Sequence, residues 1–212
     1  VVHSRISNMK IASVARPFFL IAGPCVIESK DHALKMATSL KRLSLRLDIP
    51  LIYKSSFDKA NRTAADSYRG LGLEQGLRIL QEVQKSVELP VLTDVHETSQ
   101  CSTVAEVVDV LQIPAFLCRQ TDLIAAAART GRAVNIKKGQ FADANIMIQA
   151  AAKAFKTGNR DVMVTERGNS FGYNDLVVDP RNLVRLRDSG ALVVQDVTHS
   201  VQQPGAGGNV SG

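Results

Sequence analysis

The chain has 212 residues, of which 45% are hydrophobic and 22% charged, and its formal net charge is +6. These proportions exclude a disordered tail and a disulfide-dense miniprotein, and at roughly 150 residues per domain they predict one domain over 1–212. The cations are spread along the chain, aromatic residues make up 5% and Trp is absent. This pattern argues against a nucleic-acid partner and suits small anionic ligands. A solvated basic surface without function explains the charge equally well.

Short apolar runs alternate with longer segments of helical period along the chain. The runs that predict strands are Phe18–Ala22, Leu51–Tyr53, Val91–Thr93, Val108–Leu111, Ala133–Ile136, Val162–Val164 and Leu192–Val194. The segments that predict helices are Ser29–Leu47, Gly70–Val87, Thr98–Ala105, Thr121–Thr130, Asn145–Lys156 and Asp179–Asp188, with Gly158 and Gly190 where C-caps belong. Apolar strands that alternate with helices predict a parallel sheet covered on both faces.

Polar and reactive residues gather just past the C-terminal end of each predicted strand. A (β/α)8 barrel has its active site on that rim, and the glycine motif of a dinucleotide-binding fold does not follow the first strand. The sequence therefore predicts an α/β TIM barrel. Seven strands are found where a closed barrel needs eight. We therefore expect this chain to lack the last β-α unit and to leave the seam between the first and seventh strands open.

The densest polar segment, Tyr53–Thr63, follows a strand directly and carries three cations, several hydroxyls and an amide. Lys and Arg give charge-assisted hydrogen bonds to phosphate or carboxylate, so the segment predicts a phosphate-binding loop, with a solvated loop as the alternative. Further cations follow later strands, at Arg119, Lys137, Lys138 and Arg167. Their convergence on one rim predicts a pair of substrates with several negative charges.

Other strand-end residues are candidates for chemistry. A lysine there could form a Schiff base, and Lys54, Lys59 and Lys137 are the candidates. Asp94 and His96, at the end of the third strand, are candidate acid–base or metal-ligand residues.

Cys25 and His199 follow the first and the seventh strands, which are neighbours across the rim of a closed barrel. Thiolate and imidazole together suit zinc, iron or a similar divalent metal, although two ligands make an incomplete site. A small buried thiol and a hydrogen-bonding histidine are the structural alternatives. Cys101 and Cys118 are expected to be inert packing residues, and three cysteines do not form a disulfide framework.

Neither a signal-peptide pattern nor an apolar run of the roughly 18 residues that span a membrane is present. The sequence therefore predicts a cytoplasmic protein without a membrane partner. The chain begins at Val1 rather than Met, which predicts a trimmed or partial product.

Motifs in a fixed order cover almost the whole chain from Phe18 to Gly212. They are Ile21–Ser29, Lys54–Thr63, Thr93–Glu97, Gln112–Leu123, Asn135–Phe141, Glu166–Asn174 and Asp196–Ser200. Together they closely resemble the 3-deoxy-D-manno-octulosonate 8-phosphate synthase family, also named 2-dehydro-3-deoxyphosphooctonate aldolase. The resemblance implies a TIM barrel that condenses phosphoenolpyruvate with arabinose 5-phosphate and water and releases phosphate without a Schiff base. The implied pathway is Kdo biosynthesis, for lipopolysaccharide or a cell-wall sugar.

The resemblance also implies roles for individual residues. The implied phosphoenolpyruvate ligands are Lys54, Ser56, Lys59, Lys137 and Arg167. The implied arabinose 5-phosphate ligands are Asn61, Arg62 and Thr63, together with Arg119 from a neighbouring subunit of a homotetramer or other homo-oligomer. Gln112 and Ala115 are implied as further substrate-binding residues, and the implied catalytic residues are Lys54, Asp94, Lys137 and His199.

Cys25 matches the branch of that family that needs a divalent metal such as zinc, iron or manganese, whereas the other branch has Asn there. The resemblance implies His199 as a second ligand, and a Glu and an Asp from a final strand and loop beyond Gly212 as the others. We therefore expect an incomplete site that binds metal weakly in this chain. Asp196 lies an odd number of residues from His199, so it is expected on the opposite face unless a bend intervenes.

Two alternatives remain open. The related 3-deoxy-7-phosphoheptulonate synthases use erythrose 4-phosphate, and their loop typically reads Lys-Pro-Arg-Thr. Here the loop is Lys59–Thr63, in which Asn61 favours the five-carbon sugar. The other alternative is a truncated chain that binds phosphates without turnover.

Overall fold

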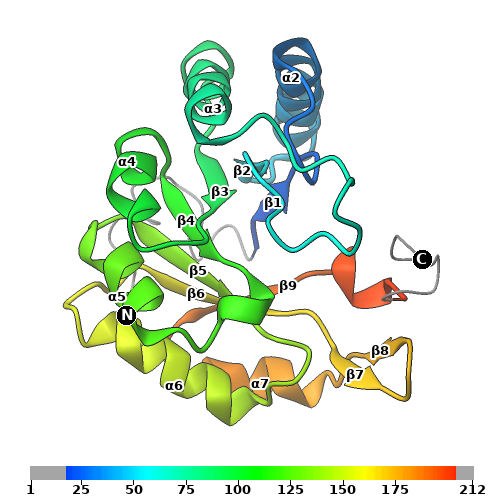
Figure 1. Cartoon of the computed structure of the whole chain (residues 1–212), viewed down its shortest axis with the longest axis vertical. Helices are drawn as coiled ribbons and strands as arrows, with labels where there is room; N and C mark the ends of the chain where they lie inside the picture. The colour runs from blue at the N-terminus through cyan, green and yellow to red at the C-terminus, as the bar shows by residue number, and fades with distance from the viewer. Residues whose placement is uncertain (1–17, 204–212) are drawn as a thin grey trace.

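A curled parallel sheet forms the centre of the molecule (Figure 1). The computed structural model describes residues 18–203, so both ends of the predicted 1–212 domain lie outside the described residues. The seven strands of the sheet follow one another in chain order: β1 (Leu20–Ala22), β2 (Leu51–Lys54), β3 (Val91–Asp94), β4 (Val110–Ile113), β5 (Ala133–Lys137), β6 (Val162–Glu166) and β9 (Leu192–Gln195). The predicted TIM-type architecture is confirmed, with seven barrel strands in the described part of the chain.

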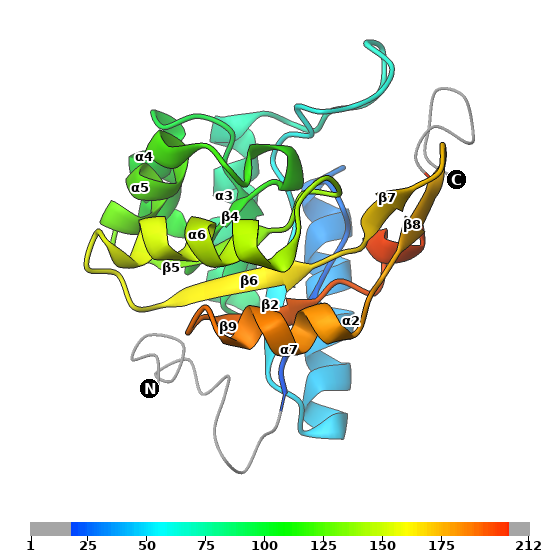
Figure 2. The same cartoon turned by 90° about the horizontal axis from the view of Figure 1, so that it is seen from below.

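Helices surround the outside of this sheet (Figures 1 and 2). They are α2 (Lys30–Leu47), α3 (Leu73–Val87), α4 (Gln100–Val107), α5 (Thr121–Arg129), α6 (Ala144–Phe155) and α7 (Arg181–Arg187), with short 3-10 turns η1 (Ala115–Leu117) and η2 (His199–Val201). Two of these helices have a side-chain N-cap. The Ser29 side chain accepts a hydrogen bond from the N–H of His32 in α2, and the Asp143 side chain accepts one from the N–H of Ile146 in α6. None of the helices in residues 18–203 combines the length and the apolar character that a membrane span requires.

Strand side chains alternate between two buried clusters. Outward-facing residues such as Leu111, Ile136 and Val164 pack with the helices in one large cluster. The inward-facing residues of a second cluster are Ile52, Leu92, Val110, Ala133 and Met163. Because side chains two positions apart on a strand share a face, each strand contributes to both clusters.

The strands β1 and β9 are the two edges of the sheet, since within residues 18–203 each pairs with one neighbour. A hollow of about 770 Å³ lies between them, lined by apolar residues of both edges such as Phe19, Ile21 and Val194. The predicted open seam is therefore confirmed.

Several predicted element boundaries are wrong by two or three residues, and two of them have a local structural cause. The fourth strand begins at Val110 rather than Val108, because Val108 caps α4 and Asp109 accepts the Val91 N–H in a turn. Helix α3 begins at Leu73 rather than Gly70. The backbone of Gly70 has φ +120°, and a Cβ there would lie 2.4 Å from the Phe57 carbonyl oxygen. A helix cannot include that conformation.

A small hairpin after β6 was not predicted. It pairs β7 (Asn169–Phe171) with β8 (Asp175–Val177) in antiparallel fashion. Its strands have three residues each and are largely exposed, so no burial pattern marks them. The predicted caps Gly158 and Gly190 lie two residues beyond the C-caps of α6 and α7, both with positive φ.

Candidate active site

The interior of the curled sheet changes from apolar to polar within two residues along five of its strands, β2 to β6. On each of these strands, the residue two positions after the inward-facing apolar residue is polar. These residues form a polar layer: Lys54, Asp94, Gln112, Asn135 and Thr165. Residues two apart on a strand point to the same side, so these side chains also face the interior. They lie towards the C-terminal ends of the strands, the end of a TIM barrel that holds the active site.

A cleft of about 580 Å³ opens at this end of the sheet. The predicted site residues that line it are Cys25, Lys54, Lys59, Asn61, Arg62, Thr63, Asp94, His96, Gln112, Ala115, Lys137, Arg167 and His199. The predicted convergence of strand ends on one face is confirmed. Of the predicted set, Ser56, Arg119 and Lys138 do not line the cleft: Ser56 and Lys138 are fully buried, and Arg119 is exposed outside it.

Asp94 is the buried anion among these cations. Its carboxylate accepts hydrogen bonds from Ser56 Oγ, from Gln112 Nε2 and, at 3.2 Å, from Lys59 Nζ. Lys54 Nζ donates to Ser56 Oγ at 3.1 Å and so joins the same group. Burial acts to raise the pKa of Asp94, but the charges of Lys54 and Lys59 outweigh it and hold that pKa well below its usual range. Asp94 is therefore ionised and fixes the positions of both lysines.

The same anion acts on the pKa values of the lysines. Burial lowers the pKa of Lys54 to about 8, against the opposing charge of Asp94. Burial also acts to lower the pKa of Lys59, but there the charges of Asp94 and Cys25 outweigh it and the pKa is raised. Two adjacent cations therefore differ in how readily they lose a proton.

The lowered pKa of Asp94 predicts a loss of stability in acid. An unfolded Asp has a pKa of about 3.9, so the contribution of this carboxylate is present above about pH 4 and is lost as pH falls below it. We expect the Asp94→Asn variant to show a flatter decline of unfolding free energy between about pH 5 and pH 3 than the wild type. Urea unfolding at each pH measures it. The exposed Asp188→Asn variant is the control, and equal slopes for Asp94→Asn and the wild type contradict the prediction.

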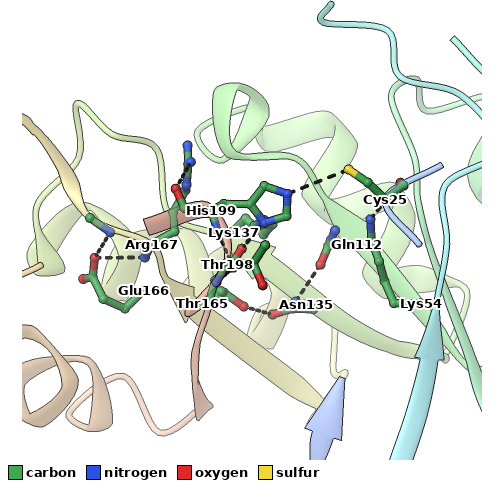
Figure 3. Close-up of polar contacts among 12 residues, drawn as sticks. Cys25, Lys54, Gln112, Asn135, Lys137, Thr165, Glu166, Arg167, Thr198 and His199 are labelled. Atoms are coloured by element: carbon green, nitrogen blue, oxygen red, sulfur yellow. Dashed lines mark hydrogen bonds and ion pairs between the residues drawn. The ribbon is translucent and has the colours of Figure 1, made fainter. Parts of the chain in front are cut away.

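Cys25 and His199 lie beside each other, as expected (Figure 3). Cys25 Sγ lies 3.8 Å from His199 Nε2. The hydrogen bond with His199, followed by the charges of Lys54 and Lys59, lowers the pKa of the Cys25 thiol to about 6. A thiolate therefore faces an imidazole nitrogen at the cleft wall.

The other nitrogen of the same ring is held by a carboxylate. His199 Nδ1 lies 2.7 Å from Asp196 Oδ2, which also accepts from Lys137 Nζ at 2.6 Å. The expectation that Asp196 points away from His199 is wrong, because a bend after β9 intervenes, in which Asp196 Oδ1 accepts the N–H groups of Thr198 and His199. Asp196 thus orients the ring so that Nε2 faces Cys25.

The pair has the donor chemistry of a soft divalent metal site, and a carboxylate behind a histidine is the usual support for a ligand. Within residues 18–203, however, no group of three His, Cys, Asp or Glu side chains could hold a metal ion. Asp196 does not complete the set, since its oxygen contacts the nitrogen of His199 that faces away from Cys25. A metal with fewer than three protein ligands is weakly held, and the residues present do not fit a complete site.

Comparison with known proteins assigns the chain to a family. A family model described as the DAHP synthetase I family matches residues 6–210. The chain belongs to the DAHP synthetase I family. Its barrel architecture and the strand-end position of its cleft agree with the resemblance found in the sequence.

Several curated relatives of the chain share one name. The 2-dehydro-3-deoxyphosphooctonate aldolase 2 of Arabidopsis thaliana is 58% identical over 191 residues, which cover 90% of this chain and 66% of the relative. The 2-dehydro-3-deoxyphosphooctonate aldolase of Acidithiobacillus ferrooxidans is 58% identical over 201 residues, which cover 95% of this chain and 72% of the relative. That of Magnetococcus marinus is 59% identical over 196 residues, which cover 92% of this chain and 68% of the relative. The chain spans about two thirds of the length of these relatives.

In this member of the DAHP synthetase I family, Lys138 does not join the rim cations, so the prediction that it converges with them is wrong. Lys138 is fully buried beside fully buried Glu166, with Nζ 3.3 Å from Glu166 Oε1. Nζ also donates to the Gly168 carbonyl at 2.8 Å and to Asn169 Oδ1 at 2.9 Å. Neighbouring residues at the end of an extended strand face opposite sides, so Lys137 faces the cleft and Lys138 the far side.

The sequence analysis missed Tyr68, which also lines the cleft. Its hydroxyl donates to the Ile27 carbonyl at 2.9 Å, and its own carbonyl accepts from Arg62 Nε at 3.2 Å. Tyr68 thus ties the loop that carries Arg62 to the segment after β1. A lone aromatic residue in a polar loop was the available signal.

Proposed function

We propose that the chain condenses phosphoenolpyruvate with arabinose 5-phosphate and water to 3-deoxy-D-manno-octulosonate 8-phosphate and phosphate. The observation that carries the proposal is the convergence of Lys54, Lys59, Arg62, Lys137 and Arg167 on one cleft. Two phosphorylated substrates, one of them also a carboxylate, need several separate cations. The names of the relatives, 2-dehydro-3-deoxyphosphooctonate aldolases, support this reaction over the erythrose 4-phosphate alternative.

The residues divide into two groups along the cleft. Lys54, Lys59, Lys137 and Arg167 bind the carboxylate and phosphate of phosphoenolpyruvate and orient its C3 towards the sugar. Asn61, Arg62 and Thr63 bind the phosphate of arabinose 5-phosphate. C3 attacks the sugar aldehyde, water adds at C2, and the C–O bond to phosphate then breaks. Asp94 keeps Lys59 and, through Ser56, Lys54 in place during these steps.

A phosphate-release assay with each aldose phosphate tests the proposal. We expect release from phosphoenolpyruvate with arabinose 5-phosphate and little with erythrose 4-phosphate. The reverse preference would support the 3-deoxy-7-phosphoheptulonate reaction instead. Binding of phosphoenolpyruvate without release would support a phosphate-binding chain without turnover.

A divalent metal belongs to the same proposal. Cys25 and His199 are the residues that would hold zinc, iron or manganese, and such a metal would supply Lewis-acid chemistry when bound. Because residues 18–203 offer no third donor, we expect the 212-residue chain to bind it weakly. We expect less than one metal ion per chain to remain after dialysis, as measured by elemental analysis. A Cys25→Ser variant is the control. Stoichiometric metal in the unmodified chain contradicts this expectation.

A homo-oligomer, such as a homotetramer, in the cytoplasm completes the proposal. Arg119 is exposed and lies outside the cleft of its own chain, which suits a side chain that reaches the sugar phosphate of a neighbouring subunit. Sedimentation of the wild type measures the assembly. Mixing Arg119→Ala chains with chains inactivated at Lys137 would restore activity if Arg119 acts across subunits.

A further inference from the structure

A chain of side-chain hydrogen bonds crosses five neighbouring strand ends beneath the cleft. Figure 3 shows its part from Thr165 through Asn135 to Gln112. Thr165 Oγ1 donates to Asn135 Oδ1 at 2.7 Å, and Asn135 Nδ2 donates to Gln112 Oε1 at 2.9 Å. Gln112 Nε2 donates to Asp94 Oδ1, and Ser56 Oγ donates to the other oxygen of Asp94. We call these residues the buried chain: Ser56, Asp94, Gln112, Asn135 and Thr165.

The direction of every bond in the buried chain follows from the charge on Asp94. An ionised carboxylate only accepts, so Gln112 must turn its NH2 group towards Asp94 and its oxygen towards Asn135. Asn135 must then present its NH2 group to Gln112 and its oxygen to Thr165. Turning over either amide would bring two acceptors or two donors together, which a buried site does not tolerate.

The members of the buried chain differ in what they contact. Asp94 and Gln112 line the cleft, whereas Asn135 and Thr165 line only the hollow behind it. Asn135 and Thr165 are nevertheless almost completely buried, at 1% and 2% exposure. Neither Asn135 nor Thr165 lines the cleft, and both bond towards Gln112, so their effect on a ligand in the cleft must pass through Gln112.

We propose that Asn135 and Thr165 are positioning residues for phosphoenolpyruvate binding. They fix the orientation of the Gln112 amide, and that amide in turn orients Asp94. Asp94 then holds Lys59 directly, and Lys54 through Ser56, at the cleft. The inference rests on the proposed function in one respect, the identity of the ligand that these lysines bind. The hydrogen-bond direction itself does not depend on that function.

The first experiment removes one hydroxyl at a time. Thr165→Val takes away the donor to Asn135, and Thr93→Val is the matched control, since the fully buried hydroxyl of Thr93 has no partner among the described residues. We expect Thr165→Val to weaken phosphoenolpyruvate binding about tenfold by calorimetry, the scale of one buried hydrogen bond. Arabinose 5-phosphate binding should stay within about twofold, because Asn61, Arg62 and Thr63 lie outside the buried chain.

Thr165→Ser restores the hydroxyl and should restore phosphoenolpyruvate affinity, and Thr93→Val should leave it unchanged. A merely structural role would lower the folded fraction without separating the two substrates. Equal affinities for Thr165→Val and Thr93→Val would overturn the proposal.

The second experiment needs no substrate. Asn135→Asp puts a second acceptor against Gln112 Oε1, and we expect the melting temperature to fall by about 5 °C. Adding Asp94→Asn supplies a donor at the far end, so that the amide of Gln112 can turn over and both contacts can form in the reverse direction. The double variant should melt above Asn135→Asp, although its lysines have lost their anion.

Simple addition of the two single losses in the double variant would refute the direction of the buried chain. A wild type that binds no phosphoenolpyruvate would refute the proposed function, and with it the positioning role, while the melting temperatures would still decide the direction.

Discussion

Replacing Lys138 with Met is expected to lower the free energy of unfolding by about 3–5 kcal/mol, because the variant leaves the charge of Glu166 buried without its cation. Met nearly fills the volume of the lysine stem, so a cavity does not account for the loss. Lys138 and Glu166 are both completely buried. Glu166 Oε1 accepts the N–H groups of Arg167 and Gly168, so the pair also fixes the loop that carries Arg167 into the cleft.

Urea unfolding monitored by circular dichroism measures this loss. The exposed Lys35→Met variant in α2 is the control and should stay within about 0.5 kcal/mol of the wild type. The double variant Lys138→Met/Glu166→Gln removes both charges and should recover part of the stability. If Lys138→Met and Lys35→Met are equally stable, the buried pair does not stabilise the fold.

Replacing Arg167 with Ala is expected to weaken phosphoenolpyruvate binding by about 2–5 kcal/mol, or about 30-fold or more in Kd. Arg167 lines the cleft at 6% exposure, and burial lowers its pKa. Its Nη2 donates to the His199 carbonyl at 2.8 Å, which holds the guanidinium in place. A charge-assisted bond formed there has little competition from water.

Arg78→Ala is the matched control, since Arg78 lies on α3 with its side chain 77% exposed and paired with Glu74 on the same helix. It should change Kd less than about fivefold. Calorimetric titration of both variants, with circular dichroism to confirm folding, measures the difference. Arg167→Lys keeps the charge and should bind with intermediate affinity. Equal dissociation constants for Arg167→Ala and Arg78→Ala would show that Arg167 does not bind the ligand.

Much of the fold could be predicted because the apolar period is local information. Runs such as Ala133–Ile136 and Val162–Val164 lie within β5 and β6, since a strand buried on both faces is apolar almost throughout. The cleft could be predicted for the same reason, because parallel strands bring their C-terminal ends to one side. Element boundaries were predicted wrongly where apolar residues continue through a turn, as at Val108.

By itself, the sequence determined the order of strands and helices, the end of the sheet at which the cleft lies, and the cationic residues that follow the strands. Only the tertiary structure decided which of two adjacent lysines reaches the cleft: Lys137 contacts Asp196 there, and Lys138 is buried against Glu166. It also decided the bend that turns Asp196 onto His199, and the hydrogen bonds that join Asp94 to Thr165 across four strands. Such contacts depend on the register and curl of the whole sheet, which residues far apart in the chain set together.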